Sequence, residues 1–259
     1  MVPPFADFES TVPFLWSQEL QDLLPREAND ISARQRSRSE RDWTLFTEQF
    51  PNVPRGEYLH AWLLVSTRAF YWETPDTLPY PWDDRLAMLP IADLFNHSAT
   101  GCSASFNMEG YTIDADKVYK AGAEISTSYG THSNDYLLAE YGFMLDENEH
   151  DRISLDDVIL PKLTEEQVIQ LEQDDVLCGQ FMFQPGLDED DKTWDVLRVM
   201  CNGDDDAVQE LLKSLLQEYE LEVKRMQRKV EGLTGPQGET IIKRWKQVAQ
   251  LTQECLNSL

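Results

Sequence analysis

Two short polar clusters near the middle of the chain combine side chains that could bind a small molecule. The first is Asp93-x-x-Asn96-His97-Ser98, and the second is Ser128-Tyr129-Gly130-x-x-Ser133-Asn134. Both lie between apolar flanks, where a polar group loses free energy unless it is paired or binds a ligand. The two clusters therefore predict a small-molecule pocket.

The elements that must position these clusters can be predicted from local patterns. Apolar residues at three- and four-residue steps predict helices over residues 43–50 and 57–70, and the prolines at 75, 79 and 81 indicate an irregular loop. Alternating residues predict strands over 103–108, 110–115 and 124–127, with a hairpin turn at 107–110. A short helix is also expected at 17–24, with Ser17 as its cap.

The two clusters, followed by Leu137–Phe143 (LLAEYGF), resemble the signature motifs of SET-domain protein-lysine methyltransferases. The resemblance is to the branch of the Rubisco large-subunit methyltransferase, with its fungal ribosomal-protein and actin-histidine relatives. It implies an α+β fold: a partial SET domain of short β-strands with a helical insert, then an all-helical C-terminal domain. The expected boundaries are 1–157 for the SET part (insert 1–85, core 86–157) and 158–259 for the helical, substrate-binding part.

The same resemblance implies a role for six residues, with S-adenosyl-L-methionine as the cofactor. Tyr129 would be the catalytic tyrosine and Tyr141 would line the lysine channel. The cofactor would be bound by Arg68, Asn96, His97 and Phe143.

The residues alone leave other interpretations open. Tyr129 could be a buried strand tyrosine with a satisfied hydroxyl, Arg68 could cap helix carbonyls, and Tyr141 and Phe143 could be core residues. Asp93 and the pair Ser133–Asn134 are expected to fix local turns. His60, His132 and His150 are assigned no role.

One part of the family pattern is not found. SET enzymes carry a Gly-x-Gly turn where the backbone approaches the cofactor closely, and this chain contains no Gly-x-Gly. The expectation is that the N-terminal SET section is absent and that the chain binds the cofactor weakly.

Composition narrows the partners. The net charge is −25, from 47 acidic and 22 basic residues. Binding to nucleic acid or to an anionic membrane needs a basic surface, so this charge argues against both kinds of partner. It is compatible with a basic protein substrate. Four dispersed cysteines, without CxC or CxxC spacing, favour free thiols in an intracellular compartment, cytoplasm or nucleus, and no metal site. The basic run 34–41 is interpreted as the solvated start of a helix.

The C-terminal residues predict two amphipathic helices. An apolar stripe runs from Val208 to Leu233, Gly235–Gly238 interrupts it, and a second stripe starts at Ile241. A coiled-coil dimer is the alternative, but the spacing departs from strict heptads, so packing within one monomer is expected.

The function expected from these features is transfer of a methyl group from S-adenosyl-L-methionine to a lysine of a protein. The alternatives are a catalytically inactive interaction module derived from the SET fold and a histidine-directed protein methyltransferase.

Overall fold

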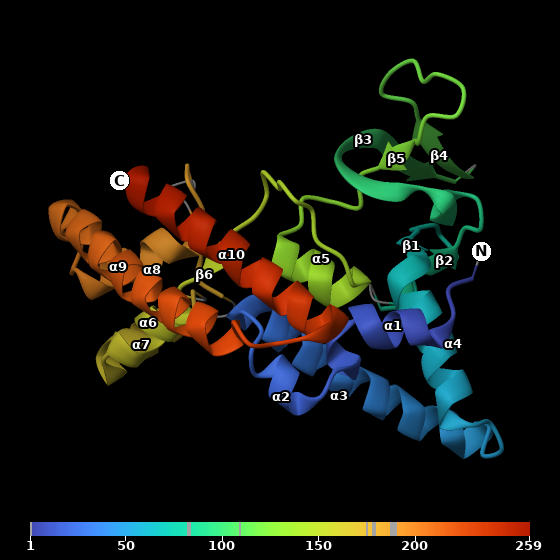
Figure 1. The fold of residues 1–259 in the computed structure, drawn as a ribbon, viewed down its shortest axis with the longest axis horizontal. Helices are drawn as coiled ribbons and strands as arrows, with labels where there is room; N and C mark the ends of the chain where they lie inside the picture. Colours follow the sequence, from blue (N-terminus) through green and yellow to red (C-terminus); the bar gives the residue numbers. More distant parts are fainter. Residues whose placement is uncertain (1, 82–83, 109, 175, 178–179, 187–190) are drawn as a thin grey trace. The chain divides into compact units, whose positions relative to one another are not determined.

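The computed structural model describes residues 2–81, 84–108, 110–174, 176–177, 180–186 and 191–259 (Figure 1). The chain divides into two compact units that do not follow chain order. The first unit comprises Met1–Phe8, Arg34–His132 and Leu145–His150, and the second comprises Glu9–Ala33, Ser133–Met144 and Asp151–Leu259. The mixed fold of many helices and short strands confirms the predicted α+β class. The boundary at 157/158 stays a prediction.

The first unit contains two small sheets. Helix α4 (Arg55–Arg68) ends where Ala69 turns extended, and it leads into β1 (Ala69–Tyr71), which pairs antiparallel with β2 (Leu86–Met88). The second sheet has the strand order β4-β3-β5. Its bounds are β3 Asn96–Asn107, β4 Gly110–Asp114 and β5 Ser126–Thr127.

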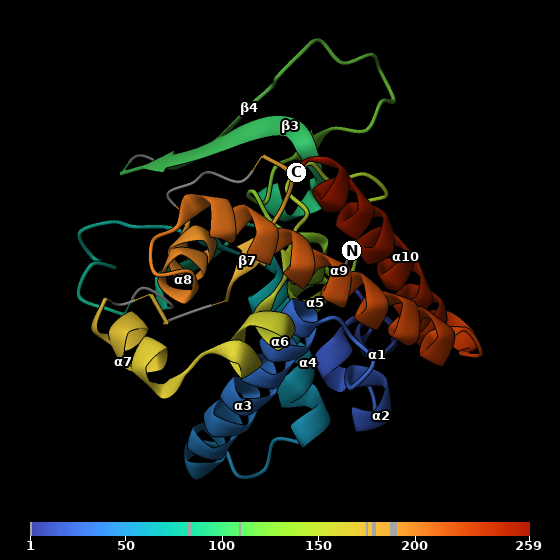
Figure 2. The ribbon, with the colours of Figure 1, turned by 90° about the vertical axis from the view of Figure 1, so that its left-hand side faces the viewer.

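Strand β3 brings the two polar clusters together. It pairs antiparallel with β4 (Figure 2) and parallel with β5, where His97 faces Thr127 and, after a register shift, Cys102 faces Thr127 again. Gly101 lies at this irregularity, and a Cβ there would fall 2.7 Å from the carbonyl oxygen of Ser126. Only glycine allows the two backbones this approach.

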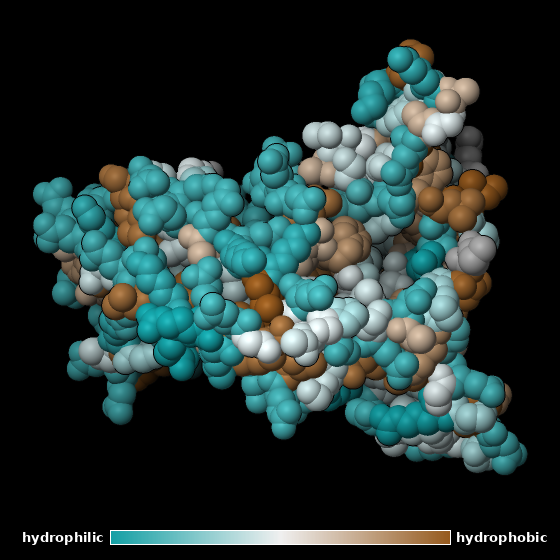
Figure 3. Space-filling view, in the orientation of Figure 1, coloured by the Kyte–Doolittle hydropathy of each residue, from teal (hydrophilic) through white to brown (hydrophobic). Residues whose placement is uncertain are grey.

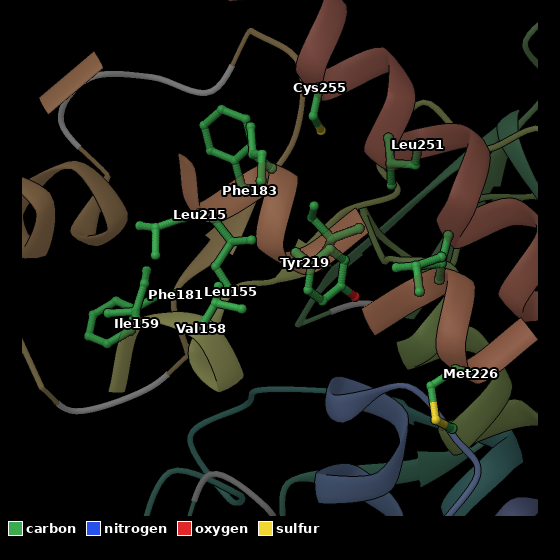
Figure 4. Packing of buried hydrophobic residues seen from close by; sticks show 14 of the residues in the cluster. Leu155, Val158, Ile159, Phe181, Phe183, Leu215, Tyr219, Met226, Leu251 and Cys255 are labelled. Carbon is green, nitrogen blue, oxygen red and sulfur yellow. The ribbon is translucent and has the colours of Figure 1, made fainter. Parts of the chain in front are cut away.

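The second unit is built around a helix pair. Helices α9 (Asp205–Val230) and α10 (Gly235–Asn257) run side by side (Figure 1), and the surface over them is largely hydrophilic (Figure 3). Most stripe residues of α9 are buried, Leu212 and Leu216 completely, in a core that also holds Phe181, Tyr219 and Leu251 (Figure 4). The prediction that the stripe packs within the chain is confirmed, and the coiled-coil alternative is not needed to cover it.

Shorter elements complete this unit. Asp191 and Asp204 cap the helices that follow them, and Thr164 forms a capping box with Gln167. The other helices and strands among the described residues are α1 Phe5–Thr11, α2 Gln18–Gln21, α3 Arg26–Gln49, α5 Asn134–Tyr141, α6 Asp156–Ile159, α7 Glu165–Gln173, α8 Lys192–Met200, β6 Ile153–Ser154, β7 Met182–Phe183, and the 3-10 helices Pro13–Leu15, Ala92–Leu94 and Leu160–Lys162.

Several local predictions differ from the structure in extent. The helix expected at 17–24 is only Gln18–Gln21, and Ser17 occupies its N-cap without a side-chain bond. The helix expected at 43–50 is the end of α3, which contains the whole basic run 34–41. The 107–110 turn is confirmed by pairing of Asn107 with Gly110.

Part of the acidic run 188–191 and Cys178 lie outside the described residues. No helix in the described part of the chain is both long and apolar enough to cross a membrane.

Candidate functional site

Arg68 is anchored at the end of α4. Its Nη1 lies 2.9 Å from both carboxylate oxygens of Asp93, and the two side chains are 28% and 23% exposed. Asp93 is the first residue of the first cluster and lies in the 3-10 helix Ala92–Leu94. We expected Asp93 to fix a local turn, whereas in the structure its carboxylate orients Arg68. The Nε of Arg68 is buried and has no hydrogen-bond partner among the described residues, which leaves one donor for a ligand.

Tyr129 is fixed by its neighbours in the first cluster. Its hydroxyl donates to the carbonyl of Phe95 at 2.7 Å, and its backbone N–H donates to Nδ1 of His97 at 3.0 Å. Burial raises the pKa of Tyr129; the positive charge of Arg68 opposes the rise and Asp93 adds to it. The phenol is therefore neutral at physiological pH. Since its hydrogen is directed at Phe95, its oxygen can serve another group only as an acceptor.

His97 is a neutral imidazole. Nδ1 accepts the Tyr129 N–H, so the proton of the neutral ring is on Nε2. Burial lowers the pKa of His97, and the neighbouring His132 and His150 lower it further, against a backbone hydrogen bond to Thr127. Its ring lies 5.1 Å from that of Tyr129. These contacts give His97 a fixed orientation and no base function.

His132, which the sequence did not single out, contacts the second cluster. Its Nε2 lies 3.0 Å from the carbonyl oxygen of Tyr129. Gly130 has φ +129°, and a Cβ there would lie 2.5 Å from that same nitrogen. The backbone conformation therefore favours glycine in the Ser-Tyr-Gly motif, and a larger residue would also displace the His132 ring from its present position. The spacing Gly130-x-His132 was the only feature of the sequence that could have indicated this contact of His132 with the second cluster.

Asn96 begins β3 and is exposed. Its Nδ2 donates to Oε1 of Glu124 at 2.6 Å, a contact that no sequence pattern indicated. Glu124 in turn lines an open hollow of about 270 Å³ together with Ser98, Thr100 and Ser126. The Asn96 amide keeps an oxygen that can accept a hydrogen bond from a ligand.

Tyr141 and Phe143 belong to the second unit. They lie at the end of α5, with ring centres 6.2 Å apart, and Tyr136 lies 6.4 Å from Tyr141. Ser133 caps the start of α5 by accepting the Tyr136 N–H, and Gly142 ends it in a left-handed conformation. The six predicted site residues thus fall into two sets: Arg68, Asn96, His97 and Tyr129 in the first unit, and Tyr141 and Phe143 in the second.

No cluster of three or more histidine, cysteine, aspartate or glutamate residues that could hold a metal ion occurs in the described ranges. The polar groups gathered around Tyr129 are instead hydrogen-bond donors and acceptors with one guanidinium, a set suited to a zwitterionic organic ligand.

The chain is similar in sequence to two proteins that are both named as N-methyltransferases. The chain is 27% identical over 245 residues to ribosomal lysine N-methyltransferase set11 of Schizosaccharomyces pombe, covering 85% of this chain and 62% of that protein. It is 35% identical over 72 residues to actin-histidine N-methyltransferase of Gallus gallus, covering 27% of this chain and 12% of that protein. The chain thus spans less than two thirds of the length of these relatives. No family model matches it.

The fold comparison extends over nearly the whole chain. The structure of Rubisco LSMT bound to sinefungin and monomethyllysine superposes with a TM-score of 0.61 at 15% identity, covering 98% of this chain and 68% of that one. At this identity the likeness concerns the fold. Sequence and fold together confirm the resemblance: the chain is similar in sequence to SET-domain protein-lysine methyltransferases and has the fold of the Rubisco large-subunit methyltransferase.

Proposed function

We propose that this chain transfers a methyl group from S-adenosyl-L-methionine to a lysine side chain of a protein. The observation that supports this most is the state of Tyr129: a neutral phenol whose hydrogen is directed at the Phe95 carbonyl, near the Arg68–Asp93 pair. The methyltransferase relatives make the same reaction the natural choice.

The residues around Tyr129 fit the cofactor. The unpartnered Nε of Arg68 suits a carboxylate, and the Asn96 amide oxygen suits an ammonium group. Arg68, Asn96, His97 and Phe143 would hold the cofactor, which when bound supplies an electrophilic methyl group. Neutral His97 adds no positive charge next to that sulfonium.

Tyr129 would orient the reaction without exchanging a proton. Its oxygen can accept weak CH···O contacts from a polarised methyl group, each worth about 0.5–1 kcal/mol. An attacking lysine must be the free amine, and alignment of that amine with the methyl group can lower the barrier by up to about 7–11 kcal/mol. The ring of Tyr141 would form a wall of the lysine channel, where an aromatic face favours an incoming ammonium.

The substrate class follows from charge. A chain of net charge −25 attracts a basic protein by long-range steering, an effect that salt screens over about 10 Å at 0.1 M. We therefore propose a basic protein substrate, such as a ribosomal protein, methylated in the cytoplasm or nucleus by a monomer. The residues 158–259 would present the acidic surface.

The test is product identification with a matched binding control. The chain is incubated with radiolabelled S-adenosyl-L-methionine and purified ribosomal proteins, and the labelled product is hydrolysed to amino acids. Methyllysine is expected. Asn96→Ala should weaken cofactor binding measured by calorimetry, whereas Asn52→Ala, an exposed asparagine of the same unit, should not.

Three results would contradict the proposal. Methylhistidine in place of methyllysine would identify a histidine-directed enzyme. Cofactor binding without transfer to any protein, or no binding at all, would identify an inactive interaction module. Equal cofactor affinity of the Asn96→Ala and Asn52→Ala variants would remove Asn96 from the site.

A further inference from the structure

The second unit contains a completely buried arginine. Arg244 of α10 is 0% exposed and lies between two buried carboxylates. Its Nε donates to Asp135 at 2.7 Å, while Nη1 and Nη2 donate to the two oxygens of Asp151 at 2.6 and 3.0 Å. All three directions of the guanidinium fork are used, so the contact is specific to arginine.

Both carboxylates lie at the start of helix α5, Asp135 within the helix and Asp151 in hydrogen-bond contact with it. Asp135 is its second residue, and one oxygen of Asp151 also accepts the backbone N–H groups of Asn134 and Arg152 at 3.0 and 3.1 Å. The side chain of Asn134 reaches Gln247, one turn beyond Arg244 on α10. Two residues of the C-terminal helix therefore contact the first turn of α5.

A second buried contact holds the same turn from another element. The hydroxyl of Ser133, the N-cap of α5, donates to Glu27 of α3 at 2.7 Å, and Arg152 pairs with the other oxygen of Glu27 at 2.8 Å. Ser133 and Glu27 are 0% and 3% exposed. The far end of α5 is constrained too, because a Cβ at Gly142 would lie 2.8 Å from the hydroxyl oxygen of Thr11.

We infer that Arg244 is a positioning residue for the methyl-transfer site: through Asp135 and Asp151 it fixes helix α5, and with it Tyr141 and Phe143. The inference rests on the proposed function for the roles of those two aromatic residues.

The charges of the cluster explain why an uncharged residue cannot replace Arg244. One guanidinium faces two carboxylates, and burial raises the pKa of Asp135 to about 6 although Arg244 opposes the rise. For Arg244 itself, burial favours the neutral form, but the attraction of Asp135 and Asp151 outweighs it, so its pKa is raised and it stays charged. Removing that charge would leave two buried carboxylates without a counterion, which strongly favours opening of the turn.

The test measures the mobility of α5 by amide hydrogen exchange in the full chain. Arg244→Lys keeps the charge but offers a point donor that cannot satisfy Asp135 and both oxygens of Asp151 together. The amides of residues 137–142 should exchange roughly 10- to 100-fold faster than in the wild type, whereas those of α9 should change much less. Arg225→Met is the matched control: Arg225 is 65% exposed, pairs with Glu222 within α9, and its loss should leave α5 protection unchanged.

Arg244→Met should give a larger loss of α5 protection than Arg244→Lys. Where that variant does not fold, the lysine variant still decides the result. Unchanged α5 protection in Arg244→Lys, or an equal loss across α5, α9 and α10, would overturn the inference and leave Arg244 a general stabilising residue.

An activity measurement separates this inference from the proposed function. In Arg244→Lys, kcat should fall at least about tenfold on a short lysine peptide as well as on an intact protein, because the helix that carries Tyr141 is displaced for both. Full kcat in a variant with a deprotected α5 would contradict positioning. A wild-type chain without any activity would contradict the proposed function, while the exchange result would still decide whether Arg244 holds α5.

Discussion

The two units of this chain are stabilised in different ways. The large hydrophobic core lies entirely in the second unit, where Leu212, Leu216 and Ile241 are 0% exposed. In the described part of the first unit, only Phe8, Leu63, Ala92 and Cys102 are buried apolar residues. The unit that holds Tyr129 thus depends on strand pairing and polar contacts, whereas the unit that holds Tyr141 depends on burial.

The surroundings of the first cluster show the same difference. Ile91 and Leu94, which flank Asp93, are 78% and 66% exposed. In the second unit the charged groups themselves are buried, with Arg244 at 0% and Asp135 at 3% side-chain exposure. A ligand site needs polar groups that a ligand can reach. On a sheet with few buried apolar residues such groups are accessible, but the local stability is lower.

The largest expected effect is in the core of the second unit. Leu212→Ala removes a completely buried side chain of α9 and should lower the free energy of unfolding by about 2–5 kcal/mol. Leu221→Ala, at a 66% exposed position of the same helix, should change it by less than about 0.5 kcal/mol. Urea unfolding followed by circular dichroism compares the two. Similar losses in both variants would mean that the α9 stripe does not form the core.

A second test uses pH to sharpen the comparison. The pKa of Asp135 is about 6 in the folded state, above its ordinary value of 3.8, so the folded state binds more protons between these values. The contribution of Asp135 to stability is complete below about pH 4 and falls by up to about 3 kcal/mol as pH rises through 6. Asp135→Asn lacks this dependence. Therefore the unfolding free energy of the wild type minus that of the variant should decrease between pH 4 and pH 7.

Urea titrations at the two pH values measure this difference, with the exposed Asp205→Asn variant as the control. A difference that stays constant, or that increases with pH, would show that Asp135 remains ionised against Arg244 throughout.

The smallest effect is expected in the first unit. The hydroxyl of Thr127, 1% exposed, donates to the carbonyl of Cys102 at 2.8 Å across the β3–β5 pair. Thr127→Val removes this hydrogen bond and leaves the carbonyl with only the longer one, 3.4 Å, from the Ser128 backbone N–H, so it should destabilise the β3–β5 region by about 1 kcal/mol. Thr112→Val, at an exposed position of β4, is the control. Hydrogen exchange resolved by unit is the measurement, and equal deprotection of α9 would show that the two units unfold together.

The sequence was most informative where one pattern determines one element. The stripe Val208–Leu233 predicted α9, and alternation with the turn at Asn107–Gly110 predicted the β3–β4 hairpin. The run 34–41 was correctly expected to be helical, but the earlier start of α3, at Arg26, was missed because the residues before the run carry too few apolar positions to indicate a helix.

Contacts between residues far apart in the sequence could not be predicted from local patterns. Arg244 is 109 positions from Asp135 and 93 from Asp151, so no spacing rule connects them. The partners of Arg68 and Asn96 were missed for the same reason: Asp93 and Glu124 are single acidic residues in a chain with 47 of them. The motifs identified the residues of the candidate site, while only the fold shows what holds each one.

The most direct test of the proposed activity is the Tyr129→Phe variant, with Tyr111→Phe of the same unit as its control. The substitution at 129 keeps the ring and removes the oxygen that donates to Phe95, so kcat for methylation of ribosomal proteins should fall roughly tenfold or more. Cofactor affinity measured by calorimetry should change little, and Tyr111→Phe should retain its turnover. Full turnover in Tyr129→Phe would show that Tyr129 is a structural residue and would contradict the proposed site.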